Sequence, residues 1–262
     1  MKLHFVKYQA TGNDFVLVDN RNGNINLSIQ QIKQICDRRF GVGADGLMMI
    51  EKHPSLDFNL VYYNSDGSQS LCGNGSRAAV KMASSLGVVN GKASFNAYDG
   101  AHQAEISNEV IKVRMNDVTV PVDSDFINTG SPHVIQFVTG IENYPVYSEG
   151  KNIRNSKPDG TNVNFVQLLG NDTIYVRTYE RGVENETLSC GTGVTASALA
   201  AYFKGYKSPI AIKTLGGDLS VAFSAQPSRS TLQRSEAGQS VTFRDIFLIG
   251  PAKMVFEGDL EL

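Results

Sequence analysis

Two cysteines of the 262-residue chain occupy matching sequence contexts. Cys72 stands in Leu-Cys-Gly-Asn-Gly and Cys190 in Ser-Cys-Gly-Thr-Gly, and a helix-favouring run of mostly small residues follows each of them. Each thiol is therefore expected at a helix N-terminus, where free backbone N–H groups and the helix dipole stabilise anions and lower the pKa of a thiol. One such cysteine would indicate a nucleophile. Two in the same setting indicate a pair of proton carriers that act on one carbon from opposite sides.

The similarity extends beyond the two cysteine loops. The offset of 118 residues between the cysteines also relates the Thr-Gly pair at 11–12 to the pair at 129–130, and a strand-like run at 58–63 to one at 176–181. Three landmarks at one offset, with no gap between them, favour two homologous halves. Each half is expected to contribute one cysteine to a site at their interface.

Each half is predicted to be mostly β-structure with one prominent helix. The two helices begin after the cysteines and end near Gly87 and Gly205, since glycine accommodates the positive φ common at helix C-termini. Ser28 and Gln31 form a capping-box pattern that predicts a further helix to about Arg39. Predicted strands cover residues 15–19, 47–50, 58–63, 93–98, 102–106, 110–115, 134–138, 163–168, 174–179, 210–214, 219–223, 241–243 and 254–256.

A helix with a small-residue face can be enclosed by its own sheet. We therefore expect an α+β fold of two pseudo-symmetric, barrel-like halves, each a mixed or antiparallel sheet wrapped around a central helix. The halves cover residues 1–120 and 121–262, with a hinge near 121–125 and a loop at 224–238. The last few residues are candidates for a return to the N-terminal half.

The composition is that of an ordinary globular protein, with 41% hydrophobic and 19% charged residues. A net charge of −2 without Lys/Arg clusters gives no electrostatic basis for binding nucleic acid or an anionic membrane. We find neither a signal peptide nor an apolar stretch long enough to span a membrane. Three cysteines without a Cys-x-x-Cys pair argue against a disulfide scaffold or a cysteine-based zinc site. We expect a cytoplasmic protein with reduced thiols, in which Cys36 is a small core residue.

Several motifs follow one another along the whole chain. They are Thr-Gly-Asn-Asp-Phe at 11–15, Tyr-Asn-Ser-Asp-Gly at 63–67, Cys-Gly-Asn-Gly-Ser-Arg at 72–77, Gly-Ser-Pro-His at 130–133, Asn162, Tyr-Glu-Arg-Gly at 179–182 and Cys-Gly-Thr-Gly at 190–193. Each motif is weak alone, but all of them in this order are specific, and together they resemble the diaminopimelate epimerase family. Proline racemase-like enzymes share the fold and the two cysteines, but their first cysteine loop typically carries His where Asn74 stands here.

The resemblance implies epimerisation of LL-2,6-diaminopimelate to the meso isomer without a cofactor or metal, in the synthesis of lysine and peptidoglycan precursors. One cysteine acts as thiolate base and the other as thiol acid, and the roles swap with direction. Backbone N–H groups at the two helix N-termini stabilise the charge that develops on the substrate carboxylate, so pyridoxal phosphate is unnecessary. By the resemblance, these donors belong to Gly73, Asn74, Gly75, Gly191 and Thr192.

The family's assisting groups for proton transfer correspond to His133 and Glu180, and which of them serves which cysteine stays open. The distal end of the substrate carries its own ammonium and carboxylate. Arg181 suits a bidentate carboxylate clamp, with Asn64 and Asn162 as amide partners and Glu180 available to the ammonium.

Asn13 is likewise implied to bind substrate, and two positions depart from the family pattern. Ser131 stands where many members have Asn, and its shorter hydroxyl is expected to reach the substrate only through water. Gly46 stands where some members have Gln, and it offers no side chain. Both departures weaken the assignment at their own positions and leave the cysteines untouched.

Two other functions compete with the epimerase. A proline or hydroxyproline racemase would use the same thiols, but Arg181 would then have no distal carboxylate to bind. A non-catalytic thiol protein would use Cys72 and Cys190 as a redox switch or as half of a metal site. Metal binding needs about four ligands, and the sequence shows no His/Cys cluster that could supply them. A small amino-acid substrate is the expected partner, and a homodimer is the expected assembly, because twofold dimers are the commonest oligomers.

Overall fold

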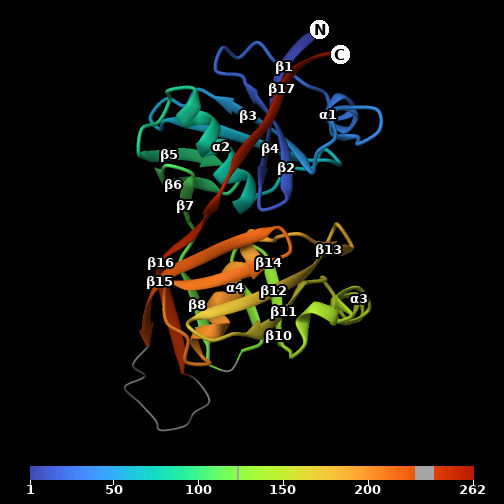
Figure 1. The fold of residues 1–262 in the computed structure, drawn as a ribbon. Coiled ribbons are helices and arrows are strands. Elements are labelled where there is room, and N and C mark those ends of the chain that lie inside the picture. Colours follow the sequence, from blue (N-terminus) through green and yellow to red (C-terminus); the bar gives the residue numbers. More distant parts are fainter. Residues whose placement is uncertain (123, 228–238) are drawn as a thin grey trace. The chain divides into compact units, whose positions relative to one another are not determined.

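The computed structural model describes residues 1–122, 124–227 and 239–262, and these residues form two compact units (Figure 1). The first unit comprises Met1–Val113 together with Gly250–Leu262, and the second comprises Arg114–Ile249. The chain therefore passes to the second unit a few residues before the expected boundary at 120. Its last segment returns to the first unit.

The first unit is built from strands around one long helix. Its elements are β1 Lys2–Ala10, β2 Asn13–Asp19, α1 Ile29–Cys36, β3 Gly46–Glu51, β4 Phe58–Asn64, α2 Gly73–Ser85, β5 Lys92–Ala97, β6 Gly100–Ser107, β7 Val110–Arg114 and β17 Lys253–Glu261. The strands pair in the order β17-β1-β2-β3-β4-β5-β6-β7. The β2–β3 and β4–β5 pairs are parallel and the others antiparallel, so the sheet is mixed.

The second unit repeats this plan. Its elements are β8 Val118–Pro121, β9 Phe126–Asn128, β10 Pro132–Phe137, the 3₁₀ turn η1 Ile141–Asn143, α3 Val146–Ser156, β11 Asn162–Leu168, β12 Thr173–Glu180, β13 Asn185–Thr187, α4 Gly191–Tyr202, β14 Ile210–Thr214, β15 Gly217–Pro227 and β16 Ser240–Pro251. The parallel pairs β10–β11 and β12–β14 correspond to β2–β3 and β4–β5, and antiparallel pairs separate them as in the first unit.

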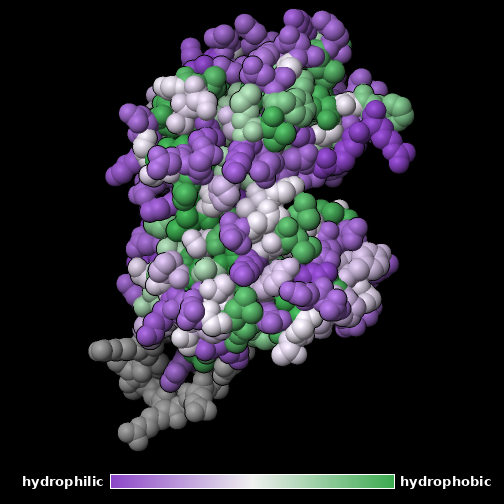
Figure 2. All heavy atoms as spheres, viewed as in Figure 1, coloured by the Kyte–Doolittle hydropathy of each residue, from purple (hydrophilic) through white to green (hydrophobic). Residues whose placement is uncertain are grey.

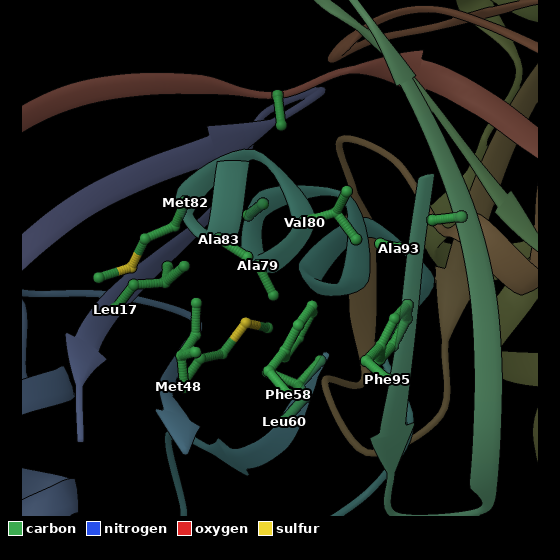
Figure 3. Packing of buried hydrophobic residues seen from close by; sticks show 14 of the residues in the cluster. Leu17, Met48, Phe58, Leu60, Ala79, Val80, Met82, Ala83, Ala93 and Phe95 are labelled. Atoms are coloured by element: carbon green, nitrogen blue, oxygen red, sulfur yellow. The ribbon is translucent and has the colours of Figure 1, made fainter. Parts of the chain in front are cut away.

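Each long helix lies in the hydrophobic core of its own unit. In Figure 3, Ala79, Val80 and Ala83 of α2 lie among side chains of the surrounding strands, including Met48 and Phe58. Small residues let the helix approach the strands closely, so the enclosing sheet can bury it on several sides. The α4 helix occupies the same position in the second unit, where ten of its twelve residues are buried. The predicted α+β fold, with a helix enclosed by a mixed sheet in each half, is confirmed.

Several predicted boundaries differ from the structure. The first helix ends at Cys36 instead of about Arg39, because the Asp37 carboxylate accepts hydrogen bonds from the backbone N–H groups of Arg39 and Phe40 and closes a turn. Residues 224–227, expected in a loop, belong to β15, while 228–238 lie outside the described residues, as does residue 123 of the expected hinge. The prediction missed β1, α3, β8, β9 and β13.

The surface is mixed in character. On the face shown in Figure 2, hydrophilic and hydrophobic residues are interspersed over both units. Among the residues that the structure describes, no helix is long and apolar enough to cross a membrane.

Candidate active site

Cys72 is the N-cap residue of α2. Its backbone is extended, and its sulfur accepts a hydrogen bond from the backbone N–H of Gly75 at 3.3 Å. The helix therefore begins at the cysteine because the thiol satisfies one of the N–H groups that have no partner within the helix. Gly73, Asn74 and Gly75 form the buried first turn, and their N–H groups belong to the positive end of the helix dipole.

Asn13 lies beside this helix start, at the beginning of β2. Its side-chain oxygen is 3.7 Å from the Cys72 sulfur and accepts a hydrogen bond from the Asn74 amide at 3.5 Å. Asn13, Cys72 and Asn74, which come from two separate sequence motifs, thus lie together in the structure. An amide oxygen at this position can hold the thiol proton of Cys72 and so orient the sulfur.

A buried cation lies one turn further along α2. Arg77 is fully buried, and its guanidinium donates to the Thr11 hydroxyl at 3.0 Å and to the Pro251 carbonyl at 3.4 Å. Burial lowers the pKa of Arg77 to about 10, and the opposing attraction of a Cys72 thiolate raises it. Arg77 is therefore positively charged at neutral pH, close to the thiol. The Cys-Gly-Asn-Gly-Ser-Arg motif contains Arg77 but does not by itself indicate this role.

Asn64 has local partners. Its amide accepts from the Tyr62 hydroxyl at 2.9 Å and donates to the hydroxyls of Ser68 and Ser70 at 3.0 and 3.1 Å. These bonds hold the turn that follows β4. The structure thus gives Asn64 a turn role and no hydrogen bond to Cys72 or Asn13 among those described, and its contact with substrate stays a prediction.

Gly46 lies at the start of β3, where the backbone leaves no room for a side chain. A Cβ atom there would lie 2.4 Å from the Tyr62 ring and 2.5 Å from the Tyr63 carbonyl oxygen. The position therefore cannot take over a side-chain contact with substrate, whereas the Tyr62 ring occupies the space beside it.

Cys190 is the N-cap residue of α4, and its first turn contains Gly191 and Thr192. Cys190 is 9% exposed as a residue, and its sulfur lies 3.5 Å from the Thr192 hydroxyl. The expectation that the helix N-terminus lowers the pKa of this thiol is wrong for Cys190. Burial raises its pKa well above the usual value, and the negative charge of Glu180 raises it further, while the Thr192 hydroxyl opposes both. Cys190 is therefore a neutral thiol at pH 7, the form that can donate a proton.

Glu180 ends β12 and belongs to the surroundings of Cys190. Its carboxylate accepts a hydrogen bond from the Thr187 hydroxyl at 2.7 Å, which fixes one of its two oxygens. Its charge acts directly on the Cys190 thiol. Glu180 therefore lies beside Cys190, while the cysteine that each assisting group serves in the reaction stays a prediction.

His133 is also connected to Cys190, but through a threonine. Its ring is completely buried on β10, and Nε2 lies 2.9 Å from the Thr192 hydroxyl, which in turn contacts the Cys190 sulfur. Burial lowers the pKa of His133 to about 3, helped by the positive charge of Arg181. The imidazole is therefore neutral at working pH and acts as a hydrogen-bonding group.

Asn164 completes this group, although none of the sequence motifs contains it. It lies on β11, is fully buried, and its side-chain nitrogen is 2.9 Å from Nδ1 of His133. The Thr178 hydroxyl donates to its side-chain oxygen at 2.9 Å. One signal was available, because an Asn in the middle of a buried strand is unusual and needs polar partners.

Asn162 and Arg181 form a separate contact. The Asn162 side chain donates to the Pro132 carbonyl at 3.2 Å and accepts from the Arg181 backbone N–H at 2.9 Å. The exposed Arg181 side chain donates to the Asp159 carbonyl at 3.0 Å. Asn162 thus fixes the backbone next to the guanidinium. Ser131 is half-buried just before the same stretch of β10.

The third cysteine, Cys36, lies in different surroundings from Cys72 and Cys190. Cys36 is buried in α1 next to Ile32 and Ile35, and burial raises its pKa to about 11. All three cysteines are free thiols. Within the described parts of the chain, no group of three or more His, Cys, Asp or Glu residues is placed to hold a metal ion.

Comparison with known proteins identifies the family of the chain. Residues 5–121 and 126–241 match the sequence profile of the family described as Diaminopimelate epimerase. A curated diaminopimelate epimerase of Flavobacterium psychrophilum is 45% identical over 271 residues, covering 98% of this chain and 99% of the relative. The enzyme of the same name from Aquifex aeolicus is 38% identical and covers 98% of each.

Solved structures with the same fold include a PhzF-family phenazine biosynthesis protein of Bacillus anthracis, with a TM-score of 0.73 at 15% identity and full coverage of both chains. A hydroxyproline epimerase from Agrobacterium vitis has a TM-score of 0.69 at 12% identity and covers 100% of this chain and 93% of that one. Two mixed-sheet units, each with a cysteine at the start of its enclosed helix, place the protein among isomerases of the racemase and epimerase kind. The chain belongs to the diaminopimelate epimerase family.

Proposed function

We propose that the protein converts LL-2,6-diaminopimelate to the meso isomer with two cysteines and no cofactor, in the synthesis of lysine and peptidoglycan precursors. The observation that carries the proposal is the pair of N-capping cysteines, Cys72 on α2 and Cys190 on α4, at the same position of two repeated units. A reaction that removes a proton from one face of a carbon and returns one to the other face needs two such groups.

The proton transfers balance without any redox partner. The thiolate of one cysteine takes the α-proton, so that an S–H bond forms as the C–H bond breaks and the electron pair moves into the α-carboxylate. The thiol of the other cysteine then gives its proton to the opposite face, so that a C–H bond forms and a thiolate remains. The free enzyme with a neutral Cys190 is poised to use Cys190 as the acid and Cys72 as the base. The reverse direction exchanges the roles.

The carbanion is the difficult species, because its charge adds to that of the carboxylate. Backbone N–H groups of the first helical turns, at Gly73, Asn74 and Gly75 and at Gly191 and Thr192, can donate to that carboxylate. Fixed dipoles of this kind stabilise a developing anion without reorganising during the reaction. The positive charge of Arg77 further favours an anion at the start of α2.

The distal end of the substrate requires groups of both charges. We assign the carboxylate to Arg181 and the ammonium to Glu180, with Asn13, Asn64, Asn162 and Ser131 as the remaining polar neighbours. Asn162 contributes by fixing the Arg181 backbone, which pre-orients the guanidinium for a bidentate contact. A substrate without the distal carboxylate would lose that contact.

The test incubates LL-diaminopimelate with purified protein and no added cofactor, and separates the isomers by chromatography. We expect the meso isomer to form, and product made in D₂O to carry deuterium at the inverted carbon, because the acid's proton exchanges with solvent. Lysine and proline serve as comparison substrates and should react very poorly. Comparable turnover of proline, or no turnover of diaminopimelate, would refute the assignment.

We further propose that the protein works in the cytoplasm, where its thiols stay reduced. Its partner is the small amino-acid substrate, with neither nucleic acid nor membrane involved, in keeping with a net charge of −2. A homodimer is the assembly that we expect. Analytical ultracentrifugation of the reduced protein would test it, and a monomer at all concentrations would contradict it.

A further inference from the structure

The Asn164 side chain can take only one orientation in its buried site. Its nitrogen lies 2.9 Å from Nδ1 of His133 and 3.5 Å from the Val134 carbonyl, while its oxygen lies 2.9 Å from the Thr178 hydroxyl. A carbonyl oxygen can only accept a hydrogen bond. Turning the amide over would place its oxygen against the Val134 carbonyl, so the amide nitrogen faces His133.

This orientation determines where the imidazole carries its proton. The amide nitrogen can only donate, so Nδ1 of His133 must accept and carries no hydrogen. A neutral imidazole then has its proton on Nε2. That N–H points at the Thr192 hydroxyl 2.9 Å away and donates to its oxygen, which leaves the hydroxyl proton of Thr192 available to the Cys190 sulfur at 3.5 Å.

We propose that Asn164 is a positioning residue that fixes His133 in the Nε2–H form and thereby orients the Thr192 hydroxyl as a hydrogen-bond donor to the Cys190 sulfur. The proposal rests on the proposed function, because only an enzyme that uses Cys190 for proton transfer needs the Thr192 hydroxyl oriented toward its sulfur. After Cys190 has given up its proton, the sulfur is a thiolate, and a hydroxyl aimed at it stabilises that charge.

Two features make the arrangement a fixed one. Asn164, His133 and Thr178 are all buried, with exposures of 0, 0 and 3%, so water cannot replace a lost partner. The charged groups that act on this cluster are Arg181, which acts on His133, and Glu180, which acts on Cys190. Neither supplies a hydrogen bond to Nδ1 among those described, so the tautomer depends on Asn164.

The experiment is nitrogen NMR of protein labelled with ¹⁵N-histidine, which distinguishes a protonated from an unprotonated ring nitrogen. The chain has four histidines, and the His133 signals are identified by their loss in His133→Gln. We expect wild-type His133 to carry its proton on Nε2 throughout the neutral pH range. A proton on Nδ1 in the wild-type protein would overturn the proposal, whatever any variant does.

Asn164→Asp is the decisive variant, because a carboxylate accepts where the amide donates. We expect the proton of His133 to move to Nδ1, and kcat to fall roughly 10–100-fold, by analogy with the loss seen when the outer hydrogen-bond partner of a metal-binding histidine is removed. The matched control is Asn162→Asp on the same strand, whose amide contacts backbone groups only, and it should leave the tautomer unchanged. An unchanged tautomer in Asn164→Asp, or the same change in both variants, would overturn the proposal.

The two proposals fail in different ways. A protein that does not epimerise diaminopimelate but has the expected tautomers refutes the proposed function alone. A protein that epimerises diaminopimelate while Asn164→Asp keeps its proton on Nε2 refutes the role of Asn164 alone.

Discussion

Gly193, the third residue of α4, has no space for even a methyl group. A Cβ atom there would lie 2.3 Å from the side-chain oxygen of Asn164 and 3.3 Å from both its Cγ and the Cβ of Cys190. Asn164 cannot move aside without breaking its hydrogen bonds to His133 and Thr178. Gly193→Ala should therefore disturb the core and the candidate active site together.

The magnitude follows from three terms. Overpacking a buried site costs about 1–3 kcal/mol, and one broken hydrogen bond of a buried group costs about 1–3 kcal/mol more. Alanine in place of glycine in a helix returns at most about 1 kcal/mol. We expect a net loss of about 1–5 kcal/mol in the free energy of unfolding of Gly193→Ala.

Gly75 provides a comparison at the corresponding position of α2. A Cβ atom there would lie only 1.8 Å from a neighbour, but that neighbour is the terminal methyl group of Met48. A methionine side chain has several rotatable bonds and can turn away at small cost. Gly75→Ala should therefore cost no more than about 1 kcal/mol, although its nominal clash is the more severe.

The assay is urea unfolding followed by circular dichroism, with the shift of the midpoint as the measured quantity. Gly170→Ala is the control, because nothing lies within 4 Å of a Cβ atom there, and it should stay within about 0.5 kcal/mol of the wild type. The reasoning is refuted if Gly193→Ala is as stable as this control, or if Gly75→Ala is the more destabilised of the two.

Three further predictions follow from the site. Cys72→Ala and Cys190→Ala should each abolish epimerisation measured by chromatography, while Cys36→Ala should keep it. An inactive Cys36→Ala variant together with an active variant of either other cysteine would refute the assignment of Cys72 and Cys190 as the proton carriers. Arg181→Met should raise the barrier in kcat/KM by about 2–5 kcal/mol, with partial recovery in Arg181→Lys, and undiminished activity would move the distal site elsewhere. Because burial lowers the pKa of His133 from 6.5 to about 3, the unfolded chain takes up a proton that the folded chain refuses. The contribution of neutral His133 to the free energy of unfolding should thus be fully present above pH 6.5, and that free energy should fall by up to about 1.4 kcal/mol per pH unit below it. In urea titrations at a series of pH values, His133→Gln should lose stability less steeply as the pH falls.

The repeat offset and the small-residue helices were enough to predict the fold, because they are properties of the sequence itself. The α3 helix, Val146–Ser156, was missed since it buries only Val146 and Gly150 and has no side-chain cap. Periodicity has little to detect in such a helix. The short β9 and β13 strands exist only through pairing with longer neighbours, which is information that the local sequence does not contain.

Site residues that belong to a sequence motif could be predicted, whereas contacts that depend on strand pairing could not. Cys72 and Cys190 are recognisable from the residues around them. The partner of Asn164 becomes known only once β11 is seen to pair in parallel with β10, which brings it beside a histidine 31 residues away. Asn64, by contrast, has the turn contacts that its Asn-Ser-Asp-Gly sequence suggests on local grounds.

Three positions that are polar in the second unit are aromatic residues or glycine in the first. The offset of 118 residues relates His133, Asn164 and Glu180 in the second unit to Phe15, Gly46 and Tyr62 in the first, where the Phe15 and Tyr62 rings meet edge to face at 6.1 Å. A dimer of identical half-length chains could not have this difference, since every substitution would occur on both sides. Fusion of two copies into one gene removes that constraint. One copy could then evolve a His–Asn–Glu network around its thiol while the other kept two aromatic residues and a glycine at the same three positions, so the two thiols of one chain lie in different surroundings.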